Sequence, residues 1–265
     1  GPLMIPLLLL VPLGPLLSWK RAELGTTLRK LRIAALAALG VALLTLVLTR
    51  RGPWLAPFGM ALAAWLVFGA LSELAWRIGL FRVPLATSLS RLMGLPAAAI
   101  GMVLAHAGLG IMVAGIIAIS LWKVEVIIAM KPGDTAQVGG YAVTFTGEMP
   151  LTGPNYTGRA GRFAVEKDGR PVSELVSEKR IFQPSRTPTT EVGLHQTMAG
   201  DLYVVMGDET AIGARAMRMY FNPLVNLIWL GAAMMFVGGI FSLTDRRYRV
   251  GAPRRAARAQ AVAAE

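Results

Sequence analysis

Long apolar runs separated by short basic segments fill the first 122 residues of the chain and return after residue 220. Five runs reach or approach the roughly 20 residues that a helix needs to cross a bilayer. They cover residues 1–18, Ile33–Thr49, Trp54–Trp76, Pro96–Trp122 and Phe221–Leu243. The first run contains Pro6, Pro12 and Pro15, so we do not expect it to form a straight helix. We expect all five runs to cross the membrane, the first as an irregular helix and the other four as regular helices.

Residues 123–220 follow a different pattern, in which short β-branched or aromatic stretches alternate with turn residues. The stretches are Val124–Met130, Tyr141–Thr146, Arg162–Lys167, Pro171–Val176, Leu202–Met206 and Ala211–Met219. Asp168-Gly169 separates two of them, and this dipeptide is a strong hairpin signal. Six to eight short strands at close spacing predict a small antiparallel sandwich or barrel.

The two patterns together predict the fold class and the domain boundaries. We expect an α-helical polytopic membrane protein with about five transmembrane helices and an inserted small antiparallel β domain. The expected parts are a four-helix membrane region over 1–122, a β domain over 123–220, a final helix over 221–243 and a basic tail over 244–265.

Charge supports this class and indicates an orientation. The chain is 54% hydrophobic and 16% charged, whereas soluble domains carry about a quarter charged residues. The net charge of +12 comes from residues beside the apolar runs, in Lys20–Arg32, Arg77–Arg91 and Arg246–Arg258. Five spans place these three segments on one side, which the positive-inside rule makes cytoplasmic. Residues 123–220 then face the periplasm or its equivalent, although Arg50 and Arg51 depart from the rule.

Composition excludes several classes of function. No basic stretch is interleaved with stacking aromatic residues, so we expect membrane lipid and no nucleic acid as a partner. The chain has no cysteine, which rules out disulfides, thiol chemistry, iron–sulfur ligation and a Cys-x-x-Cys-His haem attachment site in these residues. The opening Gly1–Met4 leads straight into apolar sequence without a basic region, which is not typical of a signal peptide.

His106 is the leading candidate for chemistry because it lies near the centre of the run Pro96–Trp122. An ionisable residue at that depth is costly and is a functional-site hypothesis by default. Imidazole is a common ligand of haem iron, and Ala105, Ala107 and Gly108 leave room for a bulky partner. The alternative is a histidine that donates to a carbonyl on a neighbouring helix.

Other polar residues favour structural roles. Glu73 lies four residues before Arg77, so the two can pair on one helical face. His195 falls in the β domain, about 90 positions from His106, and a solvated histidine is the simpler interpretation. No serine nucleophile, carboxylate dyad or phosphate-binding loop stands out, so no catalytic residue is identified.

Several stretches resemble the C-terminal part of the haem lyase CcmF/NrfE family of cytochrome c biogenesis proteins. They are Gly101–Gly110 around His106, Pro188–Glu191, Gly200–Val205, Tyr220–Gly231 and the tail from Asp245, with support from Met4–Leu7 and Gly14–Leu17. The resemblance implies a subunit that helps transfer haem from a periplasmic haem chaperone to apocytochrome c, together with other maturation subunits. In the family a membrane haem b keeps the transferred iron reduced, and His106 matches the second of its two histidine ligands.

The resemblance also implies that other family features lie outside these residues. The first membrane histidine, two periplasmic histidines and a tryptophan-rich loop belong to the family's N-terminal half, so the second axial ligand is expected from there. The chain is then a C-terminal portion or the product of a split gene. Two alternatives stay open: a structural membrane anchor that presents the β domain to partners, and a transporter subunit, although the spans carry little charge besides His106 and Glu73.

Overall fold

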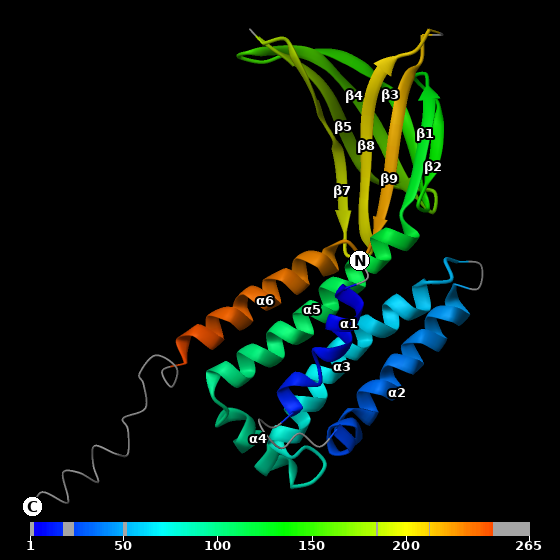
Figure 1. The fold of residues 1–265 in the computed structure, drawn as a ribbon. Helices are drawn as coiled ribbons and strands as arrows, with labels where there is room; N and C mark the ends of the chain where they lie inside the picture. Colours follow the sequence, from blue (N-terminus) through cyan, green and yellow to red (C-terminus); the bar gives the residue numbers. More distant parts are fainter. Residues whose placement is uncertain (1–2, 18–23, 50–51, 184, 212, 246–265) are drawn as a thin grey trace, which may run out of the picture. The chain divides into compact units, whose positions relative to one another are not determined.

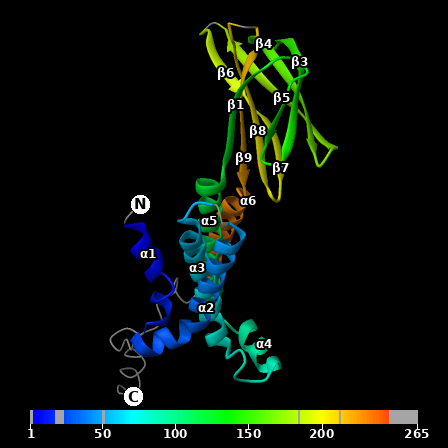
Figure 2. The ribbon, with the colours of Figure 1, turned by 90° about the vertical axis from the view of Figure 1, so that its right-hand side faces the viewer.

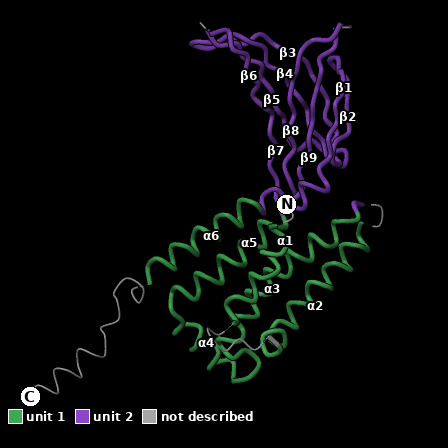
Figure 3. Tube along the Cα trace, viewed as in Figure 1, with its two compact units in different colours: residues 1–50, 54–114, 228–265 green, residues 51–53, 115–227 purple. Residues whose placement is uncertain are grey.

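The structure, a computed structural model, describes residues 3–17, 24–49, 52–183, 185–211 and 213–245 (Figure 1). It contains two compact units (Figure 3). The helical unit comprises residues 1–50, 54–114 and 228–265, and the β unit comprises residues 51–53 and 115–227. Residues 246–265 of the expected basic tail, the segment Trp19–Arg21 and the pair Arg50-Arg51 lie outside the described residues.

Four described helices are long and apolar enough to cross a membrane, which makes this a multi-pass membrane protein. They are α2 (Leu24–Leu48), α3 (Ala56–Ile78), α5 (Ala97–Trp122) and α6 (Asn226–Thr244). The helix α2 begins nine residues before the predicted apolar run, because basic residues such as Arg29 are good helix formers that extend the helix beyond its apolar part. Helices α2 and α3 lie side by side in the helical unit (Figure 1).

The described residues of the first run form no helix of spanning length, whereas the run was expected to supply one of about five spans. It folds as the short helix α1 (Met4–Leu10), followed by the 3-10 turn η1 (Gly14–Leu16). Proline disfavours helical conformation in the residue before it and removes an N–H donor, so the helix ends ahead of Pro12. Trp65 of α3 holds this segment by donating from Nε1 to the carbonyl of Leu9 at 3.0 Å.

A short helix that the sequence pattern did not predict, α4 (Leu85–Met93), follows α3 and precedes α5 along the chain (Figure 2). Its large apolar residues Leu85, Leu89 and Met93 are four residues apart and exposed, and they share one face. Helix α4 is amphipathic and belongs to the basic segment between two spans.

The β unit is a sandwich of two antiparallel sheets, as expected. One sheet has the order β1-β9-β8-β7 and the other β2-β3-β4-β5-β6. The first sheet consists of β1 (Val124–Met130), β7 (Gly193–Thr197), β8 (Gly200–Glu209) and β9 (Arg215–Pro223). The second consists of β2 (Thr135–Val138), β3 (Tyr141–Thr152), β4 (Tyr156–Lys167), β5 (Arg170–Phe182) and β6 (Thr187–Glu191).

Local sequence explains the hairpins and the core of the sandwich. Asp168 and Gly169 both have positive φ, at 53° and 71°, and join β4 to β5 in the predicted two-residue turn. Alternate residues of the strands face inward, and Phe145 and Phe163 pack at the centre with their rings 5.3 Å apart. The hydroxyl of buried Ser177 ties the sheets together, because it donates to the carbonyl of Glu191 and accepts from the amide of Met206.

The last strand continues beyond the predicted end of the β domain. Phe221 was expected to open the final membrane helix, but it lies in β9, where it packs beside the Tyr141 ring at 5.7 Å. Pro223 ends the strand, and α6 begins at Asn226. The apolar run that begins at Phe221 therefore contains the end of a strand and the start of a helix. Its hydrophobic periodicity does not show where one ends and the other begins.

Candidate functional site

His106 is the tenth of the 26 residues of α5. At 1.5 Å per residue it lies about 14 Å from the first residue of the helix and about 24 Å from the last. The helix is apolar along its whole length, so the imidazole lies in the part of α5 that a bilayer would enclose. The structure therefore places the predicted residue within a membrane-spanning helix.

Close contact between glycines fixes one face of α5 against α6. A Cβ placed on Gly108 would lie 2.7 Å from the carbonyl oxygen of Gly231, and one placed on Gly238 would lie 2.5 Å from that of Gly101. Real Cβ atoms do not come this close to a backbone oxygen, so only glycine permits this approach of the two helices. The stripe of small residues on α5 is thus used for packing.

A second face of α5 packs against α3. Gly110 lies beside Ala63 and Val67, and Ala107 and Val103 form a buried cluster with Ala70. Met234 of α6 packs against the same cluster, which assigns it a packing role.

The imidazole lies away from α6 and at the border of the α3 contact. His106 precedes Gly108 by two residues, which is about 200° around the helix, so it points away from the α6 face. Its neighbours at three residues before and four residues after, Val103 and Gly110, both contact α3.

The His106 side chain is half-buried, and no hydrogen bond or ion pair joins it to any residue within the described ranges. The alternative, an imidazole that donates to a carbonyl of a neighbouring helix, therefore lacks such a bond in the described part of the chain. An imidazole without a protein partner, on a face next to small residues, fits the role of one axial ligand of a haem iron. The chain has only one other histidine, His195, so a second imidazole ligand would come from outside the helical unit.

His195 has an ordinary structural environment in the β unit. It lies on β7 opposite Leu202 of β8, and its ring meets the edge of Tyr141 at 5.8 Å between ring centroids. Lys167 lies over the same tyrosine ring at 5.0 Å. The structure keeps His195 in a different unit from His106, and it forms no metal cluster with other ligand-type residues in the described part of the chain.

Glu73 is buried in α3, with 3% of its surface exposed, and forms the predicted ion pair with Arg77. Its Oε1 accepts from Arg77, while Oε2 has no hydrogen-bond partner among the described residues. Both residues line a cavity of about 250 Å³ together with Lys30 and Trp76. A paired carboxylate at the end of a span matches the structural interpretation of Glu73.

The family-like segment Gly200–Val205 contains a polar group that the residue pattern did not single out. Asp201 is 2% exposed, and Gln196 donates to its Oδ2 at 3.5 Å. Burial, followed by the charge of Asp201, raises the pKa of Tyr203 above its ordinary value of 10.0. These residues stabilise the β7–β8 hairpin and include no nucleophile beside a base.

A basic cavity lies between α2 and α3 and was not predicted from the sequence. It measures about 540 Å³, and Trp76 lies on its wall with Lys30 and Arg82. The available signal was a tryptophan at the end of an apolar run, close in the chain to arginine and preceded by a basic helix start. From the sequence alone, these basic residues indicate only the orientation of the spans in the membrane.

This chain is similar to the same group of known proteins in its sequence and in its fold. Residues 121–223 match the family model described as the CcmF C-terminal beta-sandwich. The chain is 44% identical over 262 residues to the cytochrome c-type biogenesis protein CycK of Rhizobium meliloti (strain 1021), covering 99% of the chain and 39% of that protein. It is 35% identical over 255 residues to the cytochrome c-type biogenesis protein CcmF of Escherichia coli (strain K12), covering 93% and 37% respectively.

A solved structure named cytochrome c heme lyase CcmF has a similar fold, with a TM-score of 0.74 and 21% identity. The match covers 92% of this chain and 39% of that one. The chain thus spans about two fifths of the length of the proteins it matches. By sequence and by fold, the chain corresponds to the C-terminal part of the CcmF family of cytochrome c biogenesis proteins.

Proposed function

We propose that this chain is the part of a cytochrome c haem lyase that holds a haem b in the membrane, with His106 as one axial ligand of the iron. The observation that carries the proposal is the imidazole of α5, which lies within a spanning helix and has no protein partner among the described residues. A neutral imidazole nitrogen would donate its lone pair to the iron. When bound, the haem supplies a one-electron redox centre within the bilayer.

The packing of α5 supports this role for the residues around His106. The faces toward α6 and α3 are fixed by glycine contacts, so the helix has little freedom to rotate and the imidazole keeps its direction. The second axial ligand would come from outside these 265 residues, from a partner or from the N-terminal region of a longer protein. Haem delivered by a periplasmic chaperone and apocytochrome c are the proposed substrates, and other maturation subunits are the proposed partners.

The charge distribution supports a location in the bacterial inner membrane with the β unit in the periplasm. Arg29 lies near the start of α2, Arg77 near the end of α3, and Arg91 before α5. Consecutive spans alternate in direction, so these positions share one end of the four described spanning helices. The positive-inside rule makes that end cytoplasmic. The β unit, inserted between α5 and α6, would serve as a docking and support domain without a catalytic residue.

A reduced-minus-oxidised absorbance spectrum of the isolated maturation complex tests the haem proposal. His106→Ala should remove or shift the membrane haem b band, because the iron loses a strong axial ligand. His195→Ala is the matched control, since it removes the other histidine from the β unit, and it should leave the band unchanged. An unaltered band in His106→Ala would assign the iron to other ligands.

The structural-anchor alternative has its own support in the closed core and tied sheets of the β unit. It predicts complexes that assemble with intact β units and no haem signal that depends on His106. Co-purification of the partner subunits with His106→Ala, alongside the spectrum, separates the two functions.

A further inference from the structure

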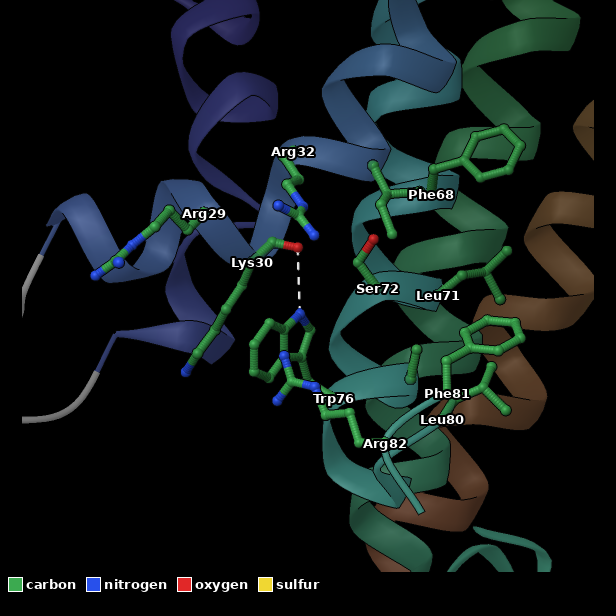
Figure 4. A pocket seen from close by; sticks show the side chains of 12 residues that line it. Arg29, Lys30, Arg32, Phe68, Leu71, Ser72, Trp76, Leu80, Phe81 and Arg82 are labelled. Carbon is green, nitrogen blue, oxygen red and sulfur yellow. Dashed lines mark hydrogen bonds between the residues drawn. The ribbon is translucent and has the colours of Figure 1, made fainter. Parts of the chain in front are cut away.

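The basic cavity of the helical unit combines positive charge with an apolar wall (Figure 4). It has a volume of about 540 Å³ and lies between the start of α2, one side of α3 and the turn that follows α3. The volume falls in the range of pockets that hold small organic molecules.

Four cations and no acidic residue are among the described residues that line this cavity: Arg29, Lys30, Arg32 and Arg82. None of the four forms an ion pair with an acidic residue in the described part of the chain. Arg29 donates only to the hydroxyl of Thr26, at 3.3 Å. The cations therefore offer uncompensated positive charge to a ligand, and the complementary ligand is an anion.

Trp76 and the turn after α3 hold two of these cations in place. Trp76 donates from Nε1 to the carbonyl of Lys30 at 3.3 Å, and the guanidinium of Arg82 lies 3.0 Å from the centroid of the indole ring (Figure 4). Phe81 has a φ of 64°, a left-handed conformation that is unfavourable for a residue with a Cβ atom. The amide of Arg82 donates to the carbonyl of Gly79 at 2.9 Å and closes this turn.

The wall along α3 is apolar and only partly covered. Phe68 and Leu71 are 37% and 45% exposed, and Ala75 continues the wall toward Trp76. From Trp76 to Phe68 the helix rises about 12 Å. A small free anion would leave this surface uncovered, whereas an amphipathic anion would satisfy the charge at one end and cover the apolar wall with its chains.

We propose that this cavity binds an anionic phospholipid, with its phosphate among Arg29, Lys30, Arg32 and Arg82 and its acyl chains along Phe68 and Leu71. Basic pockets between spanning helices on the cytoplasmic side are typical sites for anionic head groups. The lining residues that the structure describes include no histidine, cysteine, methionine or tyrosine that could ligate iron, which argues against a porphyrin here. The proposal does not depend on the role of His106.

Thermal unfolding of the purified protein, in the complex from which it is isolated, tests the proposal. The probes are phosphatidylglycerol, phosphatidylcholine with the same chains, inorganic phosphate and haemin. Phosphatidylglycerol should raise the midpoint in a saturable way, because it binds the folded state, and the other probes should not. Arg32→Gln should weaken the apparent affinity for phosphatidylglycerol roughly fivefold, as expected for one cation near a lipid phosphate.

Two further variants separate the cavity from general charge. Arg91→Gln, in α4, removes one charge from the same basic segment without touching the cavity lining, and it should keep the parent affinity. Leu71→Trp narrows the apolar wall and keeps all four cations, and it should weaken binding severalfold. Four results would each overturn the proposal. Two of them are an equal response to both phospholipids and an equal loss of affinity in Arg32→Gln and Arg91→Gln. The other two are a full response to inorganic phosphate alone and a binding of haemin that Leu71→Trp abolishes.

Discussion

The two units of the chain are stabilised in opposite ways. In the β unit the largest buried side chains, such as Phe145 and Phe163, fill a closed core, and ion pairs lie at its periphery. In the helical unit many large residues face outward, as Leu36 does at 66% exposure, and small residues such as Ala63 and Ala70 hold many of the buried positions. Water drives large side chains inward, but lipid gives them no such preference, so helices in a bilayer associate through small residues.

Because the two units differ in this way, a polar side chain is easier to recognise as functional in the helical unit than in the β unit. In the β unit, polar side chains at the sandwich surface are ordinary, and His195 beside Tyr141 attracts no special interpretation. In the helical unit, each polar side chain within a span is an exception that requires a partner. Glu73 has Arg77 as its partner, whereas His106 has none among the described residues. The difference directs attention to His106.

The largest effect on stability is expected in the sandwich core. Phe163→Ala should lower the free energy of unfolding of the β unit by about 3–5 kcal/mol, because it leaves a cavity beside Phe145. Urea-dependent proteolysis of the β unit measures this change. Val172→Ala, at a 42% exposed position of β5, should change it by less than about 0.5 kcal/mol. Similar losses for both variants would mean that the core is not closely packed.

Adjacent glycines of α6 provide a matched test of helix packing in the helical unit. Gly238 faces Gly101 at close range, so Gly238→Ala should destabilise the α5–α6 contact by about 1–3 kcal/mol. Gly239 faces open space, and Gly239→Ala should be neutral or stabilise the helix by up to about 1 kcal/mol. Unfolding in detergent followed by circular dichroism measures both. If the two variants behave alike, the close contact does not stabilise the helical unit.

A smaller, pH-dependent effect is expected at the edge of the sandwich. Burial alone would raise the pKa of Glu148, but hydrogen bonds from Arg159 and Arg215 outweigh it and hold the pKa below the ordinary 4.5. Arg215 lies on β9 of the opposite sheet, so its ion pair with Glu148 joins the two sheets, whereas Arg159 lies on β4 of the same sheet as Glu148. A lowered pKa means that this stabilisation is present above pH 4.5 and is lost as the pH falls through the lower value in the folded protein.

Glu148→Gln should therefore reduce the stability of the β unit near neutral pH by about 1 kcal/mol or less and make it less sensitive to acid. Urea unfolding of the β unit between pH 3 and pH 7 (roughly the range in which carboxylates titrate) measures both effects. Glu174→Gln is the control, because Glu174 is exposed and forms no ion pair within the described residues. Parallel pH profiles for Glu148→Gln and the parent chain would contradict the inter-sheet role of Glu148.

Much of the fold could be predicted from the sequence, because local patterns and tertiary structure agree at most positions. Apolar runs of spanning length predicted α2, α3, α5 and α6, and Asp168-Gly169 predicted the β4–β5 turn. In the first run the helix α1 ends at Leu10, because Pro12 disfavours helical conformation in the residue before it. The short amphipathic helix α4 was missed because a nine-residue segment is too short to give a strong periodic signal.

The site was only partly predictable for a different reason. The residue type and depth of His106 could be inferred from the sequence, but the absence of a hydrogen-bond partner within the described helices required coordinates. The basic cavity depends on residues from α2, α3 and the turn at Phe81, which meet only after folding. Sequence distance does not show which cations share a cavity or which ones remain without an acidic partner.

A map of the assembled maturation complex, resolved well enough to show the bonds at the membrane haem iron, tests the central claim most directly. The account predicts porphyrin density whose iron is bonded to an imidazole nitrogen of His106, with the other axial ligand from outside this chain. Iron ligated elsewhere, with the His106 imidazole hydrogen-bonded to a carbonyl of a neighbouring helix, would contradict it.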